Sequence, residues 1–453
     1  MSKTGIYWNS EMENLLNTAH MREIQLAKLQ KMLPQLYKAK PFWKERMDKA
    51  GLDPDTLNSL EEFSRKMPIL DKSQRRQLMV DNGGDVLKMA EDTMACSLDK
   101  VVLMAATSGT SGDPTPYPLT QNDIEVYSEL FARLLWRIGV RPGNRIIHCF
   151  GLSMWLAGVP YVQFMQKVGA CVLPVGAEAG TERILHFIRQ FKPDTLFGTP
   201  SLVEHLIEKT PQLIGEPVGK LGIKRIVCAG EPGAGIPEVR NKIESAYGAK
   251  LFDHGGAMGA SCAYAEYQGM HHLADDKYVI ELVDPDTLEP LPFEHGAQGM
   301  MVTTTLDFEG MLWCHETFGD IWQVFTDPCP CGQSGWRYKV IGRVDDMLKV
   351  KGVMVYPAAI DGVITSFAPR VTGEFRIVLD EKPPRVVPPL KLKVEYAEGV
   401  MESELEGLAN EITHTIHSKL RITPRINWVP PYSLERTAGK TRFIEKAYEN
   451  TEG

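Results

Sequence analysis

The sequence is poor in the features that mark secreted, membrane-spanning and nucleic-acid-binding proteins. It has only eight cysteines in 453 residues, a density too low for a disulfide-stabilised scaffold. Acidic residues outnumber basic ones by 58 to 50, for a net charge of −8, so there is no basic surplus for nucleic acid or an anionic membrane. No apolar run approaches the ~18 residues that cross a bilayer, and residues 1–8 lack a signal-like apolar core. We therefore expect a cytoplasmic protein with reduced thiols and with neither a nucleic acid nor a membrane as partner.

The rest of the composition is that of a folded protein, with 43% hydrophobic and 24% charged residues. In the middle of the chain, short apolar segments alternate with helical patterns. This alternation predicts an α/β fold with a largely parallel sheet. The strand-like segments are residues 145–150, 171–175, 195–198, 223–229 and 250–253, and the helical patterns include residues 181–190 and 201–209, with Thr181 and Ser201 as expected N-caps.

The C-terminal part has a different character. After about residue 280, short strands punctuated by Pro and Gly dominate, and a last unit begins near residue 346. Its clearest helix is expected at residues 402–420, where leucines and isoleucines form one stripe. Because no low-complexity linker is present, the boundary should be a short hinge. This pattern and the family resemblance described below together predict a large N-terminal domain with mixed and parallel sheets, residues 1–344, and a small mobile α+β domain, residues 345–453.

One segment suggests phosphate binding. The sequence TSGTSGDPT at residues 107–115 follows an apolar strand at residues 101–106. Its glycines let the backbone approach a ligand closely, and its hydroxyls and backbone N–H groups can surround a polyphosphate. A solvent-exposed turn has the same composition. The segment lacks the Gly-Lys-Ser/Thr ending, so it is not a P-loop NTPase motif.

This segment resembles the phosphate loop of the adenylate-forming superfamily, which includes acyl-CoA synthetases and luciferases. Further segments are similar to its phenylacetate–CoA ligase family. The resemblance extends through most of the chain and is strongest at residues 107–115, 319–320, 342–361 and 436–442. The other similar segments are KPFW at 40–43, LEEF at 60–63, MPILDK at 67–72, KPD at 192–194, TPS at 199–201 and AGEP at 229–232.

The resemblance implies roles for individual residues. It makes Lys440 the catalytic lysine, Asp320 the ligand of the ribose hydroxyls and Arg343 a further nucleotide contact. Asp345 becomes the hinge about which the small domain rotates, and the small domain then carries the catalytic lysine. The remaining residues implied to bind ATP or AMP are Thr107, Ser108, Gly109, Thr110, Ser111, Gly112, Gly230, Glu231, Pro232, Asp253 and His254.

The implied reaction has two steps. The carboxylate of an aromatic, phenylacetate-like acid attacks the α-phosphate of ATP, and Lys440 stabilises the developing negative charge. The small domain then rotates, and the thiolate of coenzyme A (CoA) displaces AMP from the acyl-adenylate. Mg²⁺ is the implied cofactor of the first step, and a homodimer is the implied assembly. Two alternatives remain open: an adenylating enzyme with a protein or amine acceptor, and a non-catalytic nucleotide-binding relative.

The chain departs from the superfamily pattern at the expected magnesium ligand. Ala257 and Met258 stand where a hydroxyl residue and a Glu are expected, and neither can coordinate a hard cation. Our hypothesis is that Glu266 or Glu316 substitutes, since both flank this region. His254 stands in place of the usual aromatic residue, where it either stacks near the nucleotide or is a hydrogen-bonded structural histidine.

A second cofactor is indicated by cysteine and histidine. Cys329 and Cys331 lie within one tight turn, and some family members complete such a pair into a zinc site with an upstream Cys and His. Gly269-Met270-His271 resembles the family's Gly-Leu-His, and Cys262 precedes it. These four ligands would form a Cys₃His set suited to structural Zn²⁺, with His272 and Cys314 as alternatives to Cys262.

The acyl pocket is expected to follow the strand at residues 145–150 and the loop at residues 229–232. Its candidate lining is aromatic or small, and the small run at residues 255–257 would leave room for a bulky acyl group. Each of these residues is also compatible with an ordinary core position. The candidates are Phe150, Trp155, Tyr161, Ala229 and Gly256.

Overall fold

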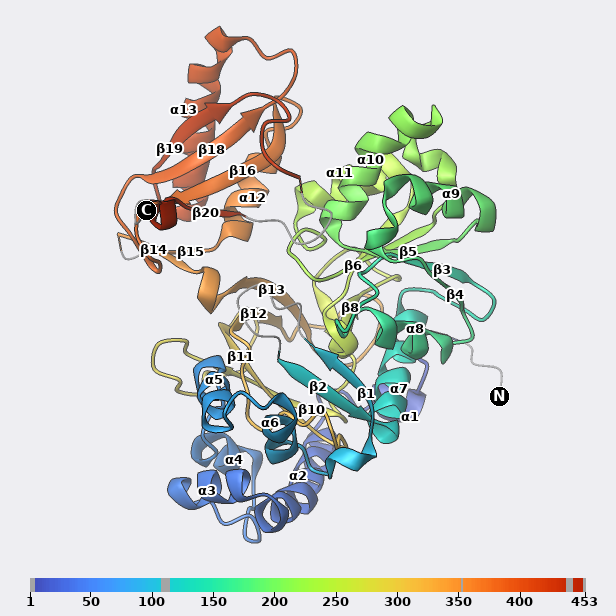
Figure 1. Ribbon diagram of the computed structural model, residues 1–453, viewed down its shortest axis with the longest axis vertical. Coiled ribbons are helices and arrows are strands. Elements are labelled where there is room, and N and C mark those ends of the chain that lie inside the picture. The colour runs from blue at the N-terminus through green and yellow to red at the C-terminus, as the bar shows by residue number, and fades with distance from the viewer. Residues whose placement is uncertain (1–4, 107–114, 352, 437–442, 451–453) are drawn as a thin grey trace. The chain divides into compact units, whose positions relative to one another are not determined.

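The computed structural model describes residues 5–106, 115–351, 353–436 and 443–450 (Figure 1). The chain forms two compact units that interleave along the sequence. The first unit comprises Met1–Gly198, Leu221–Val227 and Phe252–Lys339, and the second comprises Thr199–Lys220, Cys228–Leu251 and Val340–Gly453. The predicted phosphate loop and Lys440 lie outside the described residues. Rotation of a separate domain about Asp345, which lies in the second unit, stays a prediction.

The first unit begins with a group of helices, three of which share one core. Ser59, Asp71 and Asp85 cap three of these helices by accepting hydrogen bonds from backbone N–H groups of the first turn. The core of this group of helices includes Trp43 and Phe63. The helices are α1 (Ser10–Glu13), α2 (Ala19–Ala39), α3 (Pro41–Ala50), α4 (Leu60–Lys66), α5 (Lys72–Asp81) and α6 (Val86–Thr93).

The predicted α/β fold is confirmed by a sheet with the strand order β4-β3-β5-β6-β7 in the described part of the chain (Figure 1). Strand β3 pairs in parallel with both β4 and β5. All five strands fall inside the predicted segments. Their bounds are β3 (Arg145–His148), β4 (Cys171–Pro174), β5 (Thr195–Gly198), β6 (Arg225–Cys228) and β7 (Lys250–Asp253). In the first unit, helix α7 (Gln121–Arg137) precedes β3, α8 (Val159–Gln166) lies between β3 and β4, and α9 (Thr181–Phe191) lies between β4 and β5.

A second, antiparallel sheet of the first unit follows the order β10-β11-β12-β13-β9-β8. Trp322 and Tyr338 stack in its core with ring centroids 3.9 Å apart. The short strands expected after residue 280 are therefore confirmed. The strands are β8 (Gly259–Ser261), β9 (Met270–His272), β10 (Tyr278–Val283), β11 (Gln298–Thr305), β12 (Asp320–Phe325) and β13 (Arg337–Arg343), and β1 (Val101–Ala106) pairs with β2 (Pro116–Thr120) separately.

The second unit contains helices α10 (Pro200–Ile214) and α11 (Pro237–Tyr247), together with the C-terminal part of the chain. Helix α10 is capped by Thr199 rather than by the predicted Ser201, because Pro200 already occupies its first turn. Helix α9 likewise begins after Gly180, so Thr181 is not its N-cap. Helix α13 (Glu402–Leu420) matches both predicted ends, and Leu408, Ile412 and Ile416 are buried.

The C-terminal part of the second unit combines two small sheets, with the strand orders β15-β14-β17 and β19-β18-β16-β20 in its described residues. Within the described ranges, none of the helices has the length and apolar character needed to span a bilayer. The remaining elements are β14 (Leu348–Val350), β15 (Val353–Val355), α12 (Pro357–Thr365), β16 (Val371–Leu379), β17 (Arg385–Val386), β18 (Leu390–Tyr396), β19 (Pro424–Val429) and β20 (Ile444–Lys446).

Candidate functional site

Two of the predicted nucleotide ligands, Asp253 and Asp320, lie near one buried phenol in the first unit. Asp253 ends β7 and Asp320 begins β12. The Tyr338 hydroxyl donates to the carbonyl oxygen of Gly255 at 3.4 Å, and Asp253 Oδ2 accepts from the Tyr267 hydroxyl at 2.8 Å. Burial, and then the charges of Asp253 and Asp320, raise the pKa of Tyr338 well above its usual value. No sequence pattern pointed to Tyr338, because a tyrosine within a strand is typical of a core position.

The other predicted nucleotide-binding residues that the structure describes belong to the second unit. Glu231 Oε1 accepts a hydrogen bond from the backbone N–H of Ser201 at 2.7 Å, which places a carboxylate at the N-terminus of α10. Gly230 adopts a φ of 89°, a conformation that favours glycine. Arg343 forms an ion pair with Asp345 at 3.6 Å, and both side chains are partly exposed. The predicted hinge residue thus contacts a predicted nucleotide ligand.

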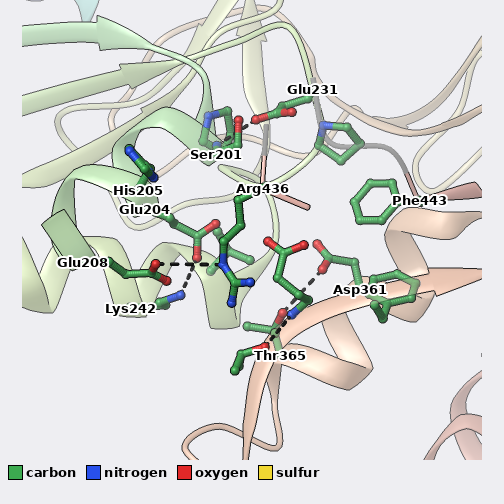
Figure 2. A pocket seen from close by; sticks show the side chains of 18 of the residues that line it. Ser201, Glu204, His205, Glu208, Glu231, Lys242, Asp361, Thr365, Arg436 and Phe443 are labelled. Atoms are coloured by element: carbon green, nitrogen blue, oxygen red, sulfur yellow. Dashed lines mark hydrogen bonds and ion pairs between the residues drawn. The ribbon is translucent and has the colours of Figure 1, made fainter. Parts of the chain in front are cut away.

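The second unit has a polar pocket that is lined in part by the loop at residues 229–232 (Figure 2). Glu231 and Pro232 form part of its lining. Lys242 Nζ pairs with Glu204 Oε1 at 2.7 Å across the pocket wall, and six carboxylates face three Lys or Arg side chains in the lining as a whole. The negative surplus makes this pocket a poor place for phosphate groups. The lining carboxylates are Glu204, Glu208, Glu231, Asp361, Glu374 and Glu435, and the cations are Lys242, Arg376 and Arg436.

Asp361 is the most deeply buried carboxyl of this pocket. Burial, reinforced by the negative charges of Glu204 and Glu374, raises its pKa to about 8. Its Oδ1 accepts from the Thr365 hydroxyl at 3.5 Å within α12 (Figure 2). Asp361 is therefore protonated at neutral pH, which lessens the repulsion among the carboxylates.

Three of the five predicted acyl-pocket residues come together in the first unit. The ring centroid of Phe150 lies 5.4 Å from that of Trp155 and 6.3 Å from that of Tyr161. A Cβ added at Gly256 would meet no atom of the described residues within 4 Å, so that side of the chain is open. Ala229 directly follows β6 and belongs to the second unit.

Further aromatic residues complete this group, which we call the aromatic cluster. Phe131 of α7 lies 4.4 Å from Tyr161 between ring centroids and 5.4 Å from Phe164 of α8. His254, predicted as a nucleotide ligand, also lies in the cluster, with its ring 5.6 Å from Phe131. The sequence missed Phe131 and Phe164, because helical aromatics at these spacings are typical of core. The cluster consists of Phe131, His148, Phe150, Trp155, Tyr161, Phe164, Phe197 and His254.

The four predicted zinc ligands converge in the first unit, and we call them the cysteine cluster. Their ligand atoms all lie within 4.8 Å of one another. Cys331 Sγ lies 3.7 Å from His271 Nε2. Three thiols and one imidazole form the donor set of a closed tetrahedral zinc site, so the residues fit this metal. The members are Cys262, His271, Cys329 and Cys331.

His272 and Cys314, the alternatives to Cys262, contact other parts of the first unit. His272 Nδ1 lies 2.7 Å from Asp275 Oδ1, and its ring stacks on Trp336. Cys314 is buried in the helical core of the first unit. Neither belongs to the group of convergent ligands.

A buried guanidinium, which no sequence pattern predicted, adjoins the cysteine cluster. Arg137 Nη2 lies 2.7 Å from Cys331 Sγ, 3.1 Å from His271 Nε2 and 3.5 Å from Cys262 Sγ. Arg137 is 0% exposed, and its Nε and Nη1 have no partner among the described residues. A positive charge is thus built into the wall of a site that three thiolates would make negative. In a lone sequence, an Arg at the end of a helix is typical of a solvated position.

The two residues proposed as magnesium ligands, Glu316 and Glu266, lie in different environments. Both carboxylate oxygens of Glu316 are bound by Arg75, through Nε and through Nη2, the latter at 2.5 Å. Glu316 is 1% exposed, so it is a buried ion-pair partner, which argues against Mg²⁺ binding by this residue. Glu266 is exposed, and its role stays a hypothesis.

Comparison with known proteins gives similarities that extend over the whole chain. Residues 352–446 match the family model of the AMP-binding enzyme C-terminal domain. The chain is 28% identical over 440 residues to a phenylacetate-coenzyme A ligase of Thermus thermophilus, covering 92% of this chain and 94% of that protein. It is 27% identical over 436 residues to a phenylacetate-coenzyme A ligase of Escherichia coli, with coverages of 94% and 95%.

A solved structure is similar along the entire chain as well. The crystal structure of a 2-hydroxyisobutyryl-CoA ligase in complex with R3-HIB-AMP aligns with a TM-score of 0.88 at 26% identity. The alignment covers 100% of this chain and 95% of that one. Both units therefore have counterparts in these proteins.

Proposed function

Because the chain belongs to the adenylate-forming enzymes, we propose that it activates an aromatic carboxylic acid with ATP and joins it to CoA. The chain is an AMP-forming acid–CoA ligase, since it is similar to such ligases over more than nine-tenths of its length. The aromatic nature of the acid is our proposal. The single observation that carries it is the aromatic cluster.

The position of the aromatic cluster supports an acyl pocket. His148 ends β3, Phe197 lies in β5, and His254 follows β7. In open α/β sheets, ligands bind outside the carboxyl ends of the strands. Aromatic walls bury a phenyl ring well, because ring–ring contacts add to the area removed from water. A phenylacetate-like acid would thus find its apolar part surrounded by rings of Phe150, Trp155 and Tyr161.

The proposed chemistry gives each residue the role that the family resemblance implies for it. The carboxylate of the acid attacks the α-phosphate of ATP and releases pyrophosphate, and the CoA thiolate then displaces AMP from the acyl-adenylate. Asp320 would accept hydrogen bonds from the ribose hydroxyls, which a carboxylate can do in bidentate fashion. Arg343 would contact the nucleotide, and Lys440 would stabilise charge in the first transition state. Mg²⁺, when bound, would neutralise phosphate charge, but Ala257 and Met258 offer it no ligand.

We further propose that the cysteine cluster holds structural Zn²⁺. Cys262 follows β8 and His271 lies in β9, whereas Cys329 and Cys331 lie in the loop between β12 and β13. A closed four-ligand site would fix this loop to the antiparallel sheet without taking part in catalysis. We also expect a cytoplasmic homodimer, which light scattering after gel filtration would test for assembly.

The test is a panel of acids with ATP, Mg²⁺ and CoA, followed by AMP release and by detection of the thioester. Arylacetic, benzoic and longer aryl acids should give both products, and the Lys440→Ala variant should lose ATP–pyrophosphate exchange. AMP release without CoA consumption would indicate another acyl acceptor. If no acid supports exchange in the wild type, the proposal fails in favour of a nucleotide-binding relative.

A small aliphatic hydroxy acid is the second candidate substrate. The observation that favours it is the similarity to 2-hydroxyisobutyryl-CoA ligase over the whole chain, with a TM-score of 0.88. Adding 2-hydroxyisobutyrate to the panel decides between the two candidates. A higher kcat/KM for that acid than for any aryl acid would overturn the aromatic assignment.

A further inference from the structure

His254 lies where the parallel sheet would bind a ligand. It directly follows Asp253, the last residue of β7. His148 and Phe197, from the ends of β3 and β5, belong to the same aromatic cluster. The carboxyl ends of these strands therefore meet around a histidine, at the edge of the sheet where α/β proteins hold their ligands.

The surroundings of His254 are apolar. Its ring centroid lies 5.6 Å from Phe131, 5.7 Å from Tyr161 and 6.1 Å from Phe197. The residue is only 4% exposed, and burial lowers the pKa of its imidazole to about 4. At neutral pH the ring is uncharged, so it can exchange a hydrogen bond but cannot form an ion pair.

The hydrogen bonding of His254 fixes which kind of group it can meet. Its Nδ1 lies 3.4 Å from the carbonyl oxygen of Gly259. A carbonyl only accepts, so Nδ1 carries the proton, and Nε2 of the neutral ring is an acceptor. Nε2 is buried and has no partner among the described residues. An unpaired buried acceptor costs about 1–3 kcal/mol, a cost that a hydrogen-bond donor on a ligand would remove.

Gly256, two residues after His254, has open space at its Cβ position. A Cβ added there would have no atom of the described residues within 4 Å. The nearest aromatic neighbour with a hydroxyl, Tyr161, forms no hydrogen bond to Nε2. The donor that Nε2 lacks must therefore come from outside the described residues.

We infer that His254 selects an acid whose acyl part carries a hydroxyl or an amino group, which donates a hydrogen bond to Nε2. This inference rests on the proposed function and narrows its substrate class. An unsubstituted acid such as phenylacetate would leave the acceptor buried and unpaired. A second carboxylate would be excluded, because it offers no donor and would be surrounded by apolar rings.

Matched acids test this inference. Each series compares an acid that carries the donor with its parent, and the 4-hydroxyphenylacetate series adds the O-methyl ether, which keeps the oxygen but cannot donate. Suitable series are 4-hydroxyphenylacetate, 4-methoxyphenylacetate and phenylacetate; mandelate and phenylacetate; 2-aminobenzoate and benzoate; 2-hydroxyisobutyrate and isobutyrate. The hydroxyl and amino series distinguish the two kinds of donor. We expect kcat/KM of the wild type to favour the donor-bearing member of at least one series by about 10- to 100-fold.

Two variants connect that preference to His254. In His254→Phe the preference, measured as the ratio of kcat/KM values within one series, should fall below about threefold, because the acceptor that the donor would meet is gone. His254→Gln keeps an acceptor oxygen and should retain part of the preference. Circular dichroism verifies folding of both variants. An equal preference in His254→Phe overturns the inference, and so does a wild type without preference in any series, a result that needs no variant. A wild type that activates no acid at all overturns the proposed function, which separates the two failures.

Discussion

The first unit contains two clusters that each surround a buried histidine, and they differ in what adjoins the imidazole. His271, 1% exposed, meets thiol sulfurs and the Arg137 guanidinium. His254, 4% exposed, meets the rings of Phe131, Tyr161 and Phe197. The cysteine cluster gathers charge and suits a metal cation, whereas the aromatic cluster excludes charge and suits an uncharged group. Burial alone thus says little about a histidine, because its neighbours determine the chemistry.

The largest expected effect comes from breaking the cysteine cluster. Replacing Cys331 by Ser removes one of four ligands, so we expect the variant to lose zinc and its melting temperature to fall by about 10 °C. Elemental analysis of protein purified without chelator and thermal unfolding measure both. Cys171→Ser, at an exposed free cysteine of β4, is the matched control and should behave as wild type. Zinc-free wild-type protein would refute the assignment of the metal.

The second effect tests the charge beside the cluster. Three thiolates, one imidazole and Zn²⁺ sum to a net charge of −1, and Arg137 supplies a buried positive charge within 3.5 Å of three ligands. We expect Arg137→Met to weaken zinc binding by about 10- to 100-fold, as removal of outer partners does elsewhere, with Arg137→Lys in between. Competition with a coloured chelator measures the affinity. Arg141→Met, whose guanidinium lies over Trp136, serves as the control. Unchanged affinity in Arg137→Met would show that the charge is not needed.

The two clusters also show how far sequence reasoning can reach. The cysteine cluster was predicted from the family resemblance, because Cys329 and Cys331 lie in one turn and His271 lies in a segment similar to one of the family. Cys262 was the member for which His272 and Cys314 stood as alternatives. Helix 402–420 and the strands at residues 195–198 and 250–253 were predicted with their bounds, since an apolar stripe and short apolar runs between helical patterns are local signals.

Other members of both sites could not be predicted. Arg137, Phe131 and Tyr338 reach their sites from elements far away in the chain, and no local pattern says which buried neighbour a side chain will meet. Periodicity shows that the Phe131 side of a helix is buried, but a core and a ligand pocket bury the same residue types. In the same way, the sequence could not show that Glu316 is an ion-pair partner and not a metal ligand, because its partner Arg75 comes from α5.

The third expected effect is a pH dependence of stability caused by the histidines of the aromatic cluster. Burial lowers the pKa values of His148 and His254 to about 4 from 6.5. Between those pH values the unfolded chain binds protons that the folded chain does not, so stability should fall as the pH drops from 6.5 toward 4. We expect each histidine to account for about 1–2 kcal/mol between pH 6.5 and 5.

Denaturant unfolding of the wild type and of His254→Phe at several pH values isolates this contribution, because any zinc release by acid is common to both proteins. The free energy of unfolding of the variant should fall less steeply with acid. His186→Gln, at an exposed histidine of α9, should leave the slope unchanged. Parallel slopes for wild type and His254→Phe would mean that the imidazole is already charged or is solvated in the folded protein.

The smallest expected effect concerns a polar atom of the aromatic cluster that makes no hydrogen bond to the described residues. The Tyr161 hydroxyl has no hydrogen-bond partner among the described residues, and burial alone raises the pKa of Tyr161. Tyr161→Phe removes a hydroxyl that has no partner among the described residues and keeps the ring, so stability should stay within about 0.5 kcal/mol of wild type. Tyr127→Phe is the matched control, since the Tyr127 hydroxyl contacts Met311 Sδ at 3.5 Å and its loss should cost about 1 kcal/mol. Thermal unfolding of the pair decides the point. A loss of more than about 1 kcal/mol in Tyr161→Phe would mean that the Tyr161 hydroxyl has a hydrogen-bond partner in the folded protein. The aromatic cluster would then contain a polar interaction, as the cysteine cluster does.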